Sequence, residues 1–429
     1  MKKQLILAGA AAGAAALLAA CAQPAQPATT LTLWVGPVGA FSAVVDDHLA
    51  DTPRNITGPL VKAFTQNNPD IGVNVEVLTT DAITTRLQNG ERPDLLLDST
   101  ERILRMEQDG VAWADLSDYW TDTILNDVNA VSPAIAPACR DSADRYRVAP
   151  LAVMVDCMAV NRELFADAGV DAILDDRTWT VGEFYDAMWA LRSNETLLDN
   201  GLLATGSISG DQGTRMLVQN LAGIPFTDPQ HRRYTLGGQE ALDALITLNG
   251  WCDEKLLRYE EKASSIDELT LFADGSTAFS LCWNADNQAN YAAETSFVPY
   301  AMAFPSVEAP KLYGTVWGFA LPEGGNTQAA LRFVQYACTD PTGGTTAVRL
   351  TGQLPAHASL GNVWADTPDE ARMAEFAALL PYLDDLYGVT PGWSDQRQAW
   401  YTLITTTLSG ALPPEEALAQ YEATVARLR

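Results

Sequence analysis

The chain has 429 residues, of which 54 are acidic and 27 are basic, so its formal net charge is −27 at pH 7. A surface this acidic repels phosphate backbones and anionic lipid headgroups, which argues against a nucleic-acid-binding protein and against electrostatic attachment to a membrane. The length exceeds what one ordinary hydrophobic core can hold, and it therefore predicts two lobes.

The first twenty residues predict an export signal. Lys2 and Lys3 precede an apolar stretch from Leu5 to Leu18, and small residues follow. This layout is typical of a secretory signal, because the stretch is shorter than the roughly 20 residues that span a bilayer. The segment Leu18-Ala19-Ala20-Cys21 resembles the bacterial lipobox, which implies that Cys21 is lipidated. An ordinary cleaved signal and an uncleaved anchor are the alternatives.

Residues 21–30 are predicted as a lipidated cysteine followed by a flexible tether. Residues 22–30 (AQPAQPATT) carry no charge and cannot form a core. A diacylglycerol supplies two acyl chains, such as palmitate, and each buried methylene contributes about 0.8 kcal/mol, so two chains make a stable anchor. We therefore expect a signal peptide at residues 1–20 and a bacterial lipoprotein on the extracytoplasmic face of the cell membrane. No later stretch is long and apolar enough to span a membrane.

The cysteines do not form a complete disulfide framework, because five of them follow Cys21. Their spacing matches no zinc motif, and three lie in apolar runs, which predicts buried thiols. A Cys139–Cys157 or a Cys252–Cys282 bridge is compatible with export, and the sequence does not decide between these pairings and free thiols. The sequence predicts no cofactor and no metal site. The five residues are Cys139, Cys157, Cys252, Cys282 and Cys338.

The first part of the folded chain predicts an α/β layered domain. Strands are expected over 31–35, 73–77 and 94–97, the second because valines alternate with polar residues. A helix over 56–67 would place Leu60, Val61 and Phe64 on one face. Strands that alternate with helices indicate an α/β fold.

A second unit is expected after Pro150. The apolar run from Val153 to Val160 predicts one buried strand, and a helix follows over 161–168. Thr180 with Glu183 predicts a capping box, and Ser265 with Glu268 repeats that arrangement at a later helix. Further strands are expected over 278–283 and 316–321, and a further helix over 327–338.

The last predicted helix carries charges that match its dipole. Glu415 and Glu416 lie in its first turn, and Arg427 and Arg429 are expected in its last. An apolar stripe of Leu418, Tyr421, Val425 and Leu428 supports the helical prediction.

The order of these motifs resembles the extracellular solute-binding proteins of family 1, the sugar-type receptors of ABC importers. Each motif is short, and their order along nearly the whole mature chain carries the resemblance. At position 160 the family usually has tyrosine, whereas this chain has valine. The motifs are Arg92-Pro93-Asp94-Leu95-Leu96, Asp115-Leu116-Ser117-Asp118-Tyr119, Asn161-Arg162-Glu163-Leu164-Phe165, Thr178-Trp179-Thr180, Phe272-Ala273-Asp274-Gly275 and Gly352-Gln353-Leu354-Pro355-Ala356.

The resemblance implies a type II periplasmic-binding-protein fold, with two α/β lobes, hinge crossings between them and a ligand cleft. It places lobe 1 at 31–150 plus 311–357 and lobe 2 at 151–310 plus 358–429, with crossings near Pro150 and Pro310. Closure about such hinges is a common way to enclose a ligand. The resemblance implies a monomeric receptor that delivers a carbohydrate to the transmembrane subunits of an ABC permease.

Candidate ligand-binding residues follow from the chemistry of sugars. Aromatic rings cover the apolar faces of a sugar, and carboxylates and amides bind its hydroxyls. The resemblance puts a ligand-stacking ring at Trp283 and another family aromatic at Trp400. Polar candidates follow predicted strand ends or lie in the loop at 209–212, and the loop from Gly36 to Phe41 is expected near the ligand. For every residue, core packing or a solvated surface is the alternative. The candidates are Trp283, Trp317, Trp393, Trp400, Asp98, Ser99, Glu101, Asn284, Asp286, Asp211 and Gln212.

Catalysis has little support in the sequence. The chain has three histidines and no metalloprotease, nucleophile-elbow, phosphate-loop or dinucleotide motif. A binding protein rather than an enzyme is therefore expected. A surface glycoside hydrolase is the alternative from another class, because its two carboxylates leave no local motif. The same fold binding a peptide, polyamine or osmolyte is the other alternative, and a polyamine receptor should have a carboxylate-rich cleft.

Overall fold

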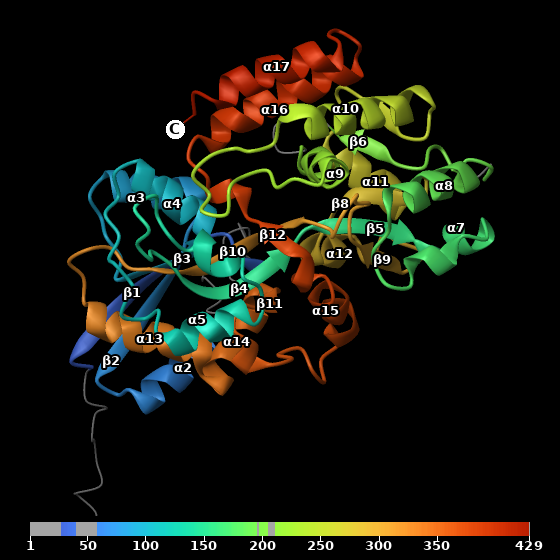
Figure 1. Cartoon of the computed structure of the whole chain (residues 1–429). Coiled ribbons are helices and arrows are strands. Elements are labelled where there is room, and N and C mark those ends of the chain that lie inside the picture. The colour runs from blue at the N-terminus through green and yellow to red at the C-terminus, as the bar shows by residue number, and fades with distance from the viewer. Residues whose placement is uncertain (1–26, 40–57, 195–196, 205–210, 429) are drawn as a thin grey trace, which may run out of the picture.

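The computed structural model describes residues 27–39, 58–194, 197–204 and 211–428, which form two α/β units (Figure 1). The predicted signal peptide, Cys21, most of the tether, the loop beyond Gly39 and the first residues of the 209–212 loop lie outside this part of the chain. Within the described ranges, no helix is both long enough and apolar enough to cross a membrane.

Unit one is built on a seven-stranded sheet of order β11-β4-β10-β3-β1-β2, with β12 paired to β10. β1 is parallel to β2 and β3, whereas β10 is antiparallel to β3 and β4. A strand from the second half of the chain therefore lies in the middle of the first sheet. The strands are β1 (Thr29–Val35), β2 (Ile71–Val77), β3 (Leu95–Ser99), β4 (Ala149–Val155), β10 (Leu312–Ala320), β11 (Leu354–Pro355) and β12 (Leu383–Asp385).

Helices cover both faces of this sheet. α13 and α14 contact β4 on one face and pack with α2, whereas α4 contacts β10 and β3 on the other. The Phe333 ring, 5.1 Å from Phe64 and 6.0 Å from Phe319, joins the helical layer to the sheet. The helices are α2 (Gly58–Asn67), α3 (Thr80–Gln88), α4 (Thr100–Gln108), α5 (Asp122–Asn129), α6 (Ile135–Ala138), α13 (Thr327–Thr339) and α14 (Pro341–Thr351), with the 3-10 turn η3 (Ala358–Leu360).

Unit two contains two smaller sheets, of order β8-β5-β9 and β6-β7. Their strands are β5 (Cys157–Asn161), β6 (Leu202–Ala204), β7 (Arg258–Glu260), β8 (Phe279–Trp283) and β9 (Pro299–Met302). The surrounding helices are α7 (Arg162–Asp167), α8 (Val181–Leu191), α9 (Gln212–Ala222), α10 (Gly238–Asp253), α11 (Ser265–Ala273), α12 (Ala285–Tyr291), α16 (Trp393–Leu408) and α17 (Pro414–Val425), with η1 (Asp171–Leu174).

The segment between η3 and α16 contacts both units. It contains α15 (Glu370–Ala377), η4 (Leu380–Tyr382) and η5 (Tyr387–Val389). α15 contacts β11 of unit one and also β9 and α12 of unit two, and η5 contacts both α4 and α16. The chain crosses between the units again near Lys311, where Asn220 of α9 stabilises it. The Asn220 side chain forms two 2.8 Å hydrogen bonds, one with the backbone N–H and one with the carbonyl of Lys311.

The run from Val153 to Val160, predicted as one strand, is two strands in different sheets. β4 ends at Val155, β5 begins at Cys157, and Asp156 marks the change of sheet. Hydrophobic pattern cannot reveal this break, because strands buried on both faces read as continuous apolar runs. The lobe boundary that we placed at Pro150 stays a prediction.

The capping box at Thr180 and Glu183 is confirmed, but the second box was assigned one residue too late. Ser264 and Asp267 cap α11, rather than Ser265 and Glu268. The sequence Ser-Ser-Ile-Asp-Glu offers two boxes of equal spacing, and the core decides between them. The Glu268 carboxylate turns inward and accepts hydrogen bonds from Ser280 Oγ (2.8 Å) and from two backbone N–H groups of β8.

The last helix has the predicted acidic first turn but no basic last turn. α17 ends at Val425, so Arg427 lies beyond it, and Arg429 is outside the described residues. The helix ends with the last buried residue of its apolar stripe, since Leu428 is only partly buried.

The cysteine prediction that we preferred is confirmed. All five cysteines after Cys21 are free thiols, and four of them are buried. Neither the Cys139–Cys157 nor the Cys252–Cys282 bridge is present.

We expect Glu268 to make the free energy of unfolding depend on pH. Burial raises the pKa of its carboxyl to about 7 from an ordinary value of 4.5. Stabilisation by the bound proton is therefore complete below about pH 4.5 and is lost as the pH rises through about 7. Between these limits the free energy of unfolding of Glu268→Gln should rise relative to that of the wild type by up to about 1.4 kcal/mol for each pH unit. Urea unfolding of both proteins across this range measures the difference, with the exposed Glu416→Gln as control. A constant difference contradicts the prediction.

Candidate functional site

Asp156 is a polar node where the chain passes from one unit to the other. Its backbone N–H donates to the carbonyl of Tyr313 on β10 of unit one (2.9 Å). Its carboxylate accepts hydrogen bonds from Asn284 Nδ2 (2.8 Å) and from the Gln212 side chain, both of unit two. The residue is only 1% exposed. Its backbone is thus tied to one unit and its side chain to the other.

Opposing effects act on the pKa of the Asp156 carboxyl at this node. Burial raises the pKa of Asp156 to about 6, and the neighbouring Asp286 acts in the same direction. The hydrogen bonds from Asn284 and Gln212, and the nearby Arg215 guanidinium, oppose that rise. Hydrogen bonds donated to a buried carboxylate favour its charged form.

Asn284 and Asp286, both predicted site residues, lie at the start of α12. Asn284 Oδ1 accepts from the N–H of Asn287 (2.9 Å) while its Nδ2 binds Asp156, so the orientation of this amide is fixed. Asp286 Oδ1 accepts from Gln353 Nε2 of unit one (2.7 Å), a direct contact between the units. Burial raises the pKa of Asp286, and Gln353 and Arg372 oppose the rise.

Asp211, Trp393 and two arginines form a second cluster in unit two. The buried Asp211, at the start of α9, forms ion pairs with Arg215 and with Arg397 (3.1 Å). The Arg215 guanidinium lies 4.7 Å from the centroid of the Trp393 ring, and the Arg397 guanidinium lies 5.6 Å from it, both within cation–π range. Protein groups therefore cover the ring that we predicted to line the cleft.

The predicted site residues of unit one form a separate group at the end of β3. Asp98 Oδ1 accepts from Ser99 N–H (2.7 Å) and Arg102 Nε (2.5 Å), and Asp98 is fully buried. Burial raises the pKa of Asp98, against the pull of Arg102. Gly36 approaches so closely that a Cβ there would lie 2.8 Å from the Asp98 carboxyl carbon. Ser99 caps α4 by accepting from Arg102 N–H (3.3 Å).

Glu101 and Trp317 complete that group. Glu101 pairs with Arg105 (2.5 Å) and accepts from Tyr313 Oη (3.5 Å). Trp317 lies on β10 opposite Ser99 and is 7% exposed, and its indole Nε1 has no hydrogen-bond partner within the part of the chain that the structure describes. Tyr313 connects this group to the node, because its carbonyl accepts from Asp156.

The structure places Trp283 and Trp400 in the core of unit two, with both rings fully buried. Trp283 packs edge-to-face on Phe272 (5.2 Å) and donates to Gln288 (3.3 Å). Trp400 packs edge-to-face on Phe226 (5.2 Å) and donates to Thr214 (3.1 Å). Both rings therefore pack in the core, which was the alternative to a place in the ligand site. A position that matches a family motif does not reveal which way a side chain points.

A polar cavity of about 550 Å³ lies beside Gln212 on unit two. Its lining combines amide and hydroxyl side chains with one tyrosine ring and a few apolar side chains, and Gln212, which also binds Asp156, is shared by the cavity and the node. Only Gln212 was predicted. The spacing of Asn287, Asn290, Tyr291 and Glu294 on one helical face was the available signal. The lining residues are Gln212, Ser265, Ile266, Leu269, Thr270, Cys282, Asn287, Asn290, Tyr291 and Glu294.

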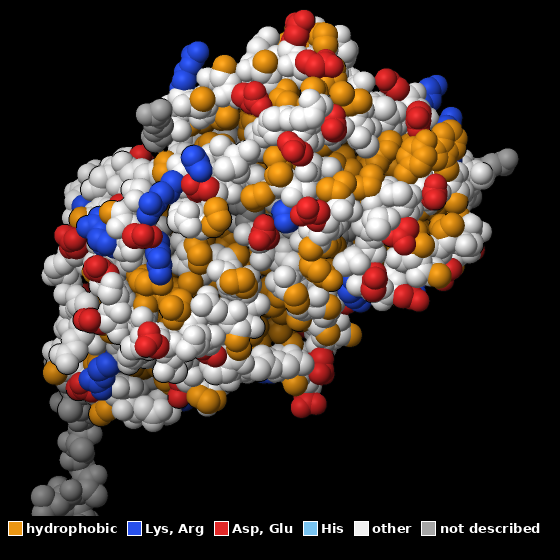
Figure 2. Space-filling model, viewed as in Figure 1, with side chains coloured by type: hydrophobic (Ala, Val, Ile, Leu, Met, Phe, Trp, Pro, Cys, Tyr) orange, Lys and Arg blue, Asp and Glu red, His pale blue; other side chains and the backbone are white. Residues whose placement is uncertain are grey.

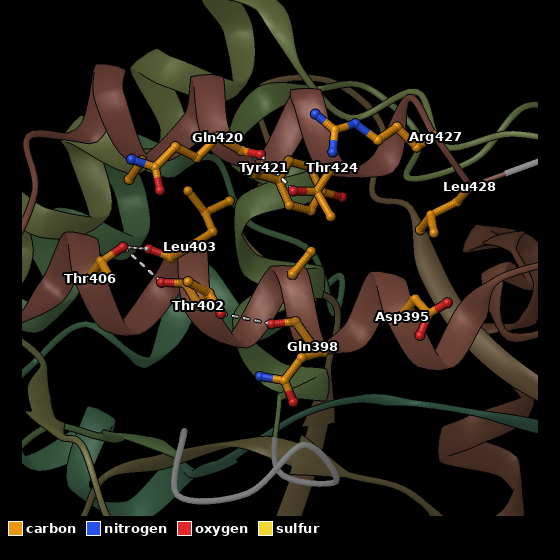
Figure 3. A pocket seen from close by; sticks show the side chains of 12 residues that line it. Asp395, Gln398, Thr402, Leu403, Thr406, Gln420, Tyr421, Thr424, Arg427 and Leu428 are labelled. Atoms are coloured by element: carbon orange, nitrogen blue, oxygen red, sulfur yellow. Dashed lines mark hydrogen bonds between the residues drawn. The ribbon is translucent and has the colours of Figure 1, made fainter.

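A groove of about 470 Å³ between α16 and α17 is a weaker candidate (Figure 3). The Thr402 and Thr406 hydroxyls donate to carbonyls of their own helix, at 3.0 and 2.7 Å. The groove contains none of the predicted site residues. Among the described residues, no cluster of His, Cys, Asp and Glu could hold a metal ion.

Comparison with known proteins assigns the fold. The model of the bacterial extracellular solute-binding protein family matches residues 47–342. Among curated proteins, no sequence matches this chain. The cyclic α-maltosyl-1,6-maltose-binding protein of Arthrobacter globiformis has a TM-score of 0.73 and 18% identity, covering 93% of this chain and 98% of its own.

Two further solved structures are similar. The ABC substrate-binding protein from Listeria monocytogenes, in complex with cycloalternan, has a TM-score of 0.65 and 18% identity, covering 93% of this chain and 98% of its own. The GacH receptor of Streptomyces glaucescens has a TM-score of 0.64 and 16% identity, covering 94% of this chain and 99% of its own. At these identities the likeness shows the fold, which is the two-lobed α/β type II periplasmic-binding-protein fold.

Removing the Asp156 carboxylate should destabilise the protein. Asp156→Ala removes the acceptor of the half-buried amide donors of Asn284 and Gln212, and the loss of these hydrogen bonds to a carboxylate should cost about 1–3 kcal/mol in the free energy of unfolding. Chemical unfolding measures this loss. The exposed Asp253 on α10 is the matched control, and Asp253→Ala should stay within about 0.5 kcal/mol of the wild type. Equal effects of the two substitutions would show that Asp156 is not a structural node.

Proposed function

Because the chain belongs to the bacterial extracellular solute-binding proteins, we propose that it captures a neutral sugar or oligosaccharide and delivers it to the permease of an ABC importer. Family membership supports a substrate-binding role, and the sugar, the permease and the delivery are the proposed part. The observation that carries the choice of ligand is the cavity beside Gln212, whose lining combines amides and hydroxyls with the Tyr291 ring. Such a lining suits a ligand with many hydroxyls and an apolar ring face.

The charged groups of the site argue against a polyamine. Asp211 is paired with two arginines, Asp98 with Arg102, and Glu101 with Arg105. A carboxylate already neutralised by a guanidinium attracts a cationic ligand weakly. Figure 2 shows Asp and Glu side chains scattered over the visible face rather than gathered in one place. On this face, therefore, the acidic side chains do not form a cluster that would attract a polycation.

The partners of the carboxylates near the site also argue against glycoside hydrolysis. That reaction requires two carboxyl groups roughly 5–10 Å apart on either side of the scissile bond. Asp156 lies beneath the amides of Asn284 and Gln212, and Asp286 is bound by Gln353. Among the described residues that line the cavity, Glu294 is the single carboxylate. This arrangement supports binding without chemical change.

Lipid anchoring through Cys21 is part of the proposal, and it rests on the N-terminal motif alone. Cys21→Ala removes the acceptor of the lipid, so the protein should move from the membrane fraction to the soluble fraction of its bacterial host. Cys252→Ala, which removes a free thiol of unit two, is the control. A Cys21→Ala protein that stays in the membrane fraction would contradict the anchor.

Thermal-shift measurement against a panel of solutes tests the ligand class. A ligand that binds only the folded state raises the melting temperature. We expect neutral oligosaccharides to do so, and polyamines, short peptides and betaine-type osmolytes to have no effect. Shifts by one of those other classes, with none by any sugar, would replace the sugar assignment.

Tyr291 provides the sharper test once a sugar binds. Tyr291→Ala removes the one aromatic ring among the described residues of the cavity lining and should weaken that sugar about tenfold, as measured by titration calorimetry. Tyr185 is the control, because it lies on α8 and bonds to Glu254, away from the cavity. Equal affinity of the Tyr291→Ala and wild-type proteins would place the sugar elsewhere.

A further inference from the structure

The connection between α9 and α10 reaches from unit two to unit one. Residues 223–237, here called the 223–237 loop, pass along the side of the molecule towards α4 and are drawn in yellow-green in Figure 1. The loop is internally ordered by hydrogen bonds between the backbones of Asp228 and Arg233 (3.1 Å) and of Phe226 and Thr235 (2.9 Å). Its base is fixed by the buried Phe226 ring, 5.2 Å from the Trp400 ring. The loop is therefore a defined arm of unit two.

The arm meets a defined element of unit one. Arg232 forms an ion pair with Asp144 (3.2 Å) across the two units. Asp144 lies at the tip of a hairpin that is closed by a bridge between Arg140 and Tyr146. The Tyr146 ring stacks on Trp120 of unit one at 4.3 Å and 14°. Because both partners are held by their own units, the ion pair connects the units themselves.

The contact around this ion pair is mostly polar and encloses a cavity. This cavity, of about 200 Å³, is lined by polar side chains of unit one, among them Glu107 and Asp141, and by Gln230 and His231 of the loop, with Leu104, Val389 and Pro391 as its apolar part. A water molecule takes about 30 Å³ in the liquid, so several waters fit a space of this size. Separating two hydrated polar surfaces costs little hydrophobic free energy. The contact can therefore break and reform.

We propose that the 223–237 loop is a latch between the two units and that the Arg232–Asp144 ion pair holds it shut. The latch biases the units towards the joined form before any ligand binds. It goes beyond the proposed function, because it requires no particular solute.

The latch is weak. The Arg232 and Asp144 side chains are 48% and 57% exposed, and exposed pairs of this kind change an equilibrium by about two- to fivefold. A small bias leaves the equilibrium under the control of a ligand that binds the joined form more tightly.

Arg232→Ala and Arg233→Ala form a matched pair for the test. Both remove one positive charge from the same loop, but Arg233 pairs with Asp228 inside the loop (3.4 Å). Pulsed electron spin resonance measures the distances between labels on the two units in ligand-free protein. Ketone-bearing residues at the exposed positions Asp118 and Glu240 carry the labels, which avoids the free thiols. Arg232→Ala should raise the ratio of long to short distances about two- to fivefold, and Arg233→Ala should leave it unchanged.

A mutant cycle and salt complete the design. Asp144→Asn should change the distances as Arg232→Ala does, because the other pair of Asp144, with Arg140 (3.5 Å), lies within unit one, and the double variant should change them no further. About 1 M salt should remove most of the difference between Arg232→Ala and wild type. Equal distance distributions for Arg232→Ala and Arg233→Ala, or effects of Arg232→Ala and Asp144→Asn that add in the double variant, would overturn the latch. Because no ligand is present, a negative sugar screen leaves this result intact, and a failed latch leaves sugar binding intact.

Discussion

The buried carboxylate of Asp156 is the constraint on which the arrangement of the site depends. It lies where the chain leaves the large sheet, and an isolated charge at that depth would be costly. Gln212 from the start of α9 and Asn284 from the start of α12 satisfy it, which brings two helix starts of unit two to the junction. The cavity beside Gln212 follows from that arrangement, because Gln212 and Asn287 both line it. The need to satisfy one carboxylate thus positions the groups that we propose to bind the ligand.

Other carboxylates around the site also have partners within the protein. The carboxylates of Asp98, Glu101 and Asp211 are matched by guanidinium groups, so they neither repel one another nor attract a cation strongly. Amides and hydroxyls, with the Glu294 carboxylate, are the polar groups of the cavity lining. Their hydrogen bonds to a neutral solute carry a smaller desolvation cost than a buried charge would. Reversible capture is consistent with that balance.

Three of the described contacts between the two units are polar as well. Gln353 binds Asp286, Arg232 binds Asp144, and Asn220 binds the backbone at Lys311. Directional contacts of this kind fix the relative position of two bodies without the large apolar burial that would make their separation costly. The hydrated cavity beneath the 223–237 loop has the same consequence.

The sequence by itself determined the features that depend on near neighbours. The alternating valines of β2, the box at Thr180 and the order of family motifs were all readable, because each rests on residues a few positions apart. Long-range partners decided the rest. The indole N–H of the buried Trp400 finds its acceptor in Thr214, 186 positions away in the sequence. Trp283 is covered by α11, through the Phe272 ring. Asp156 was not foreseen, because the buried strands on either side of it have the same apolar composition, and only their pairing partners reveal that they belong to different sheets.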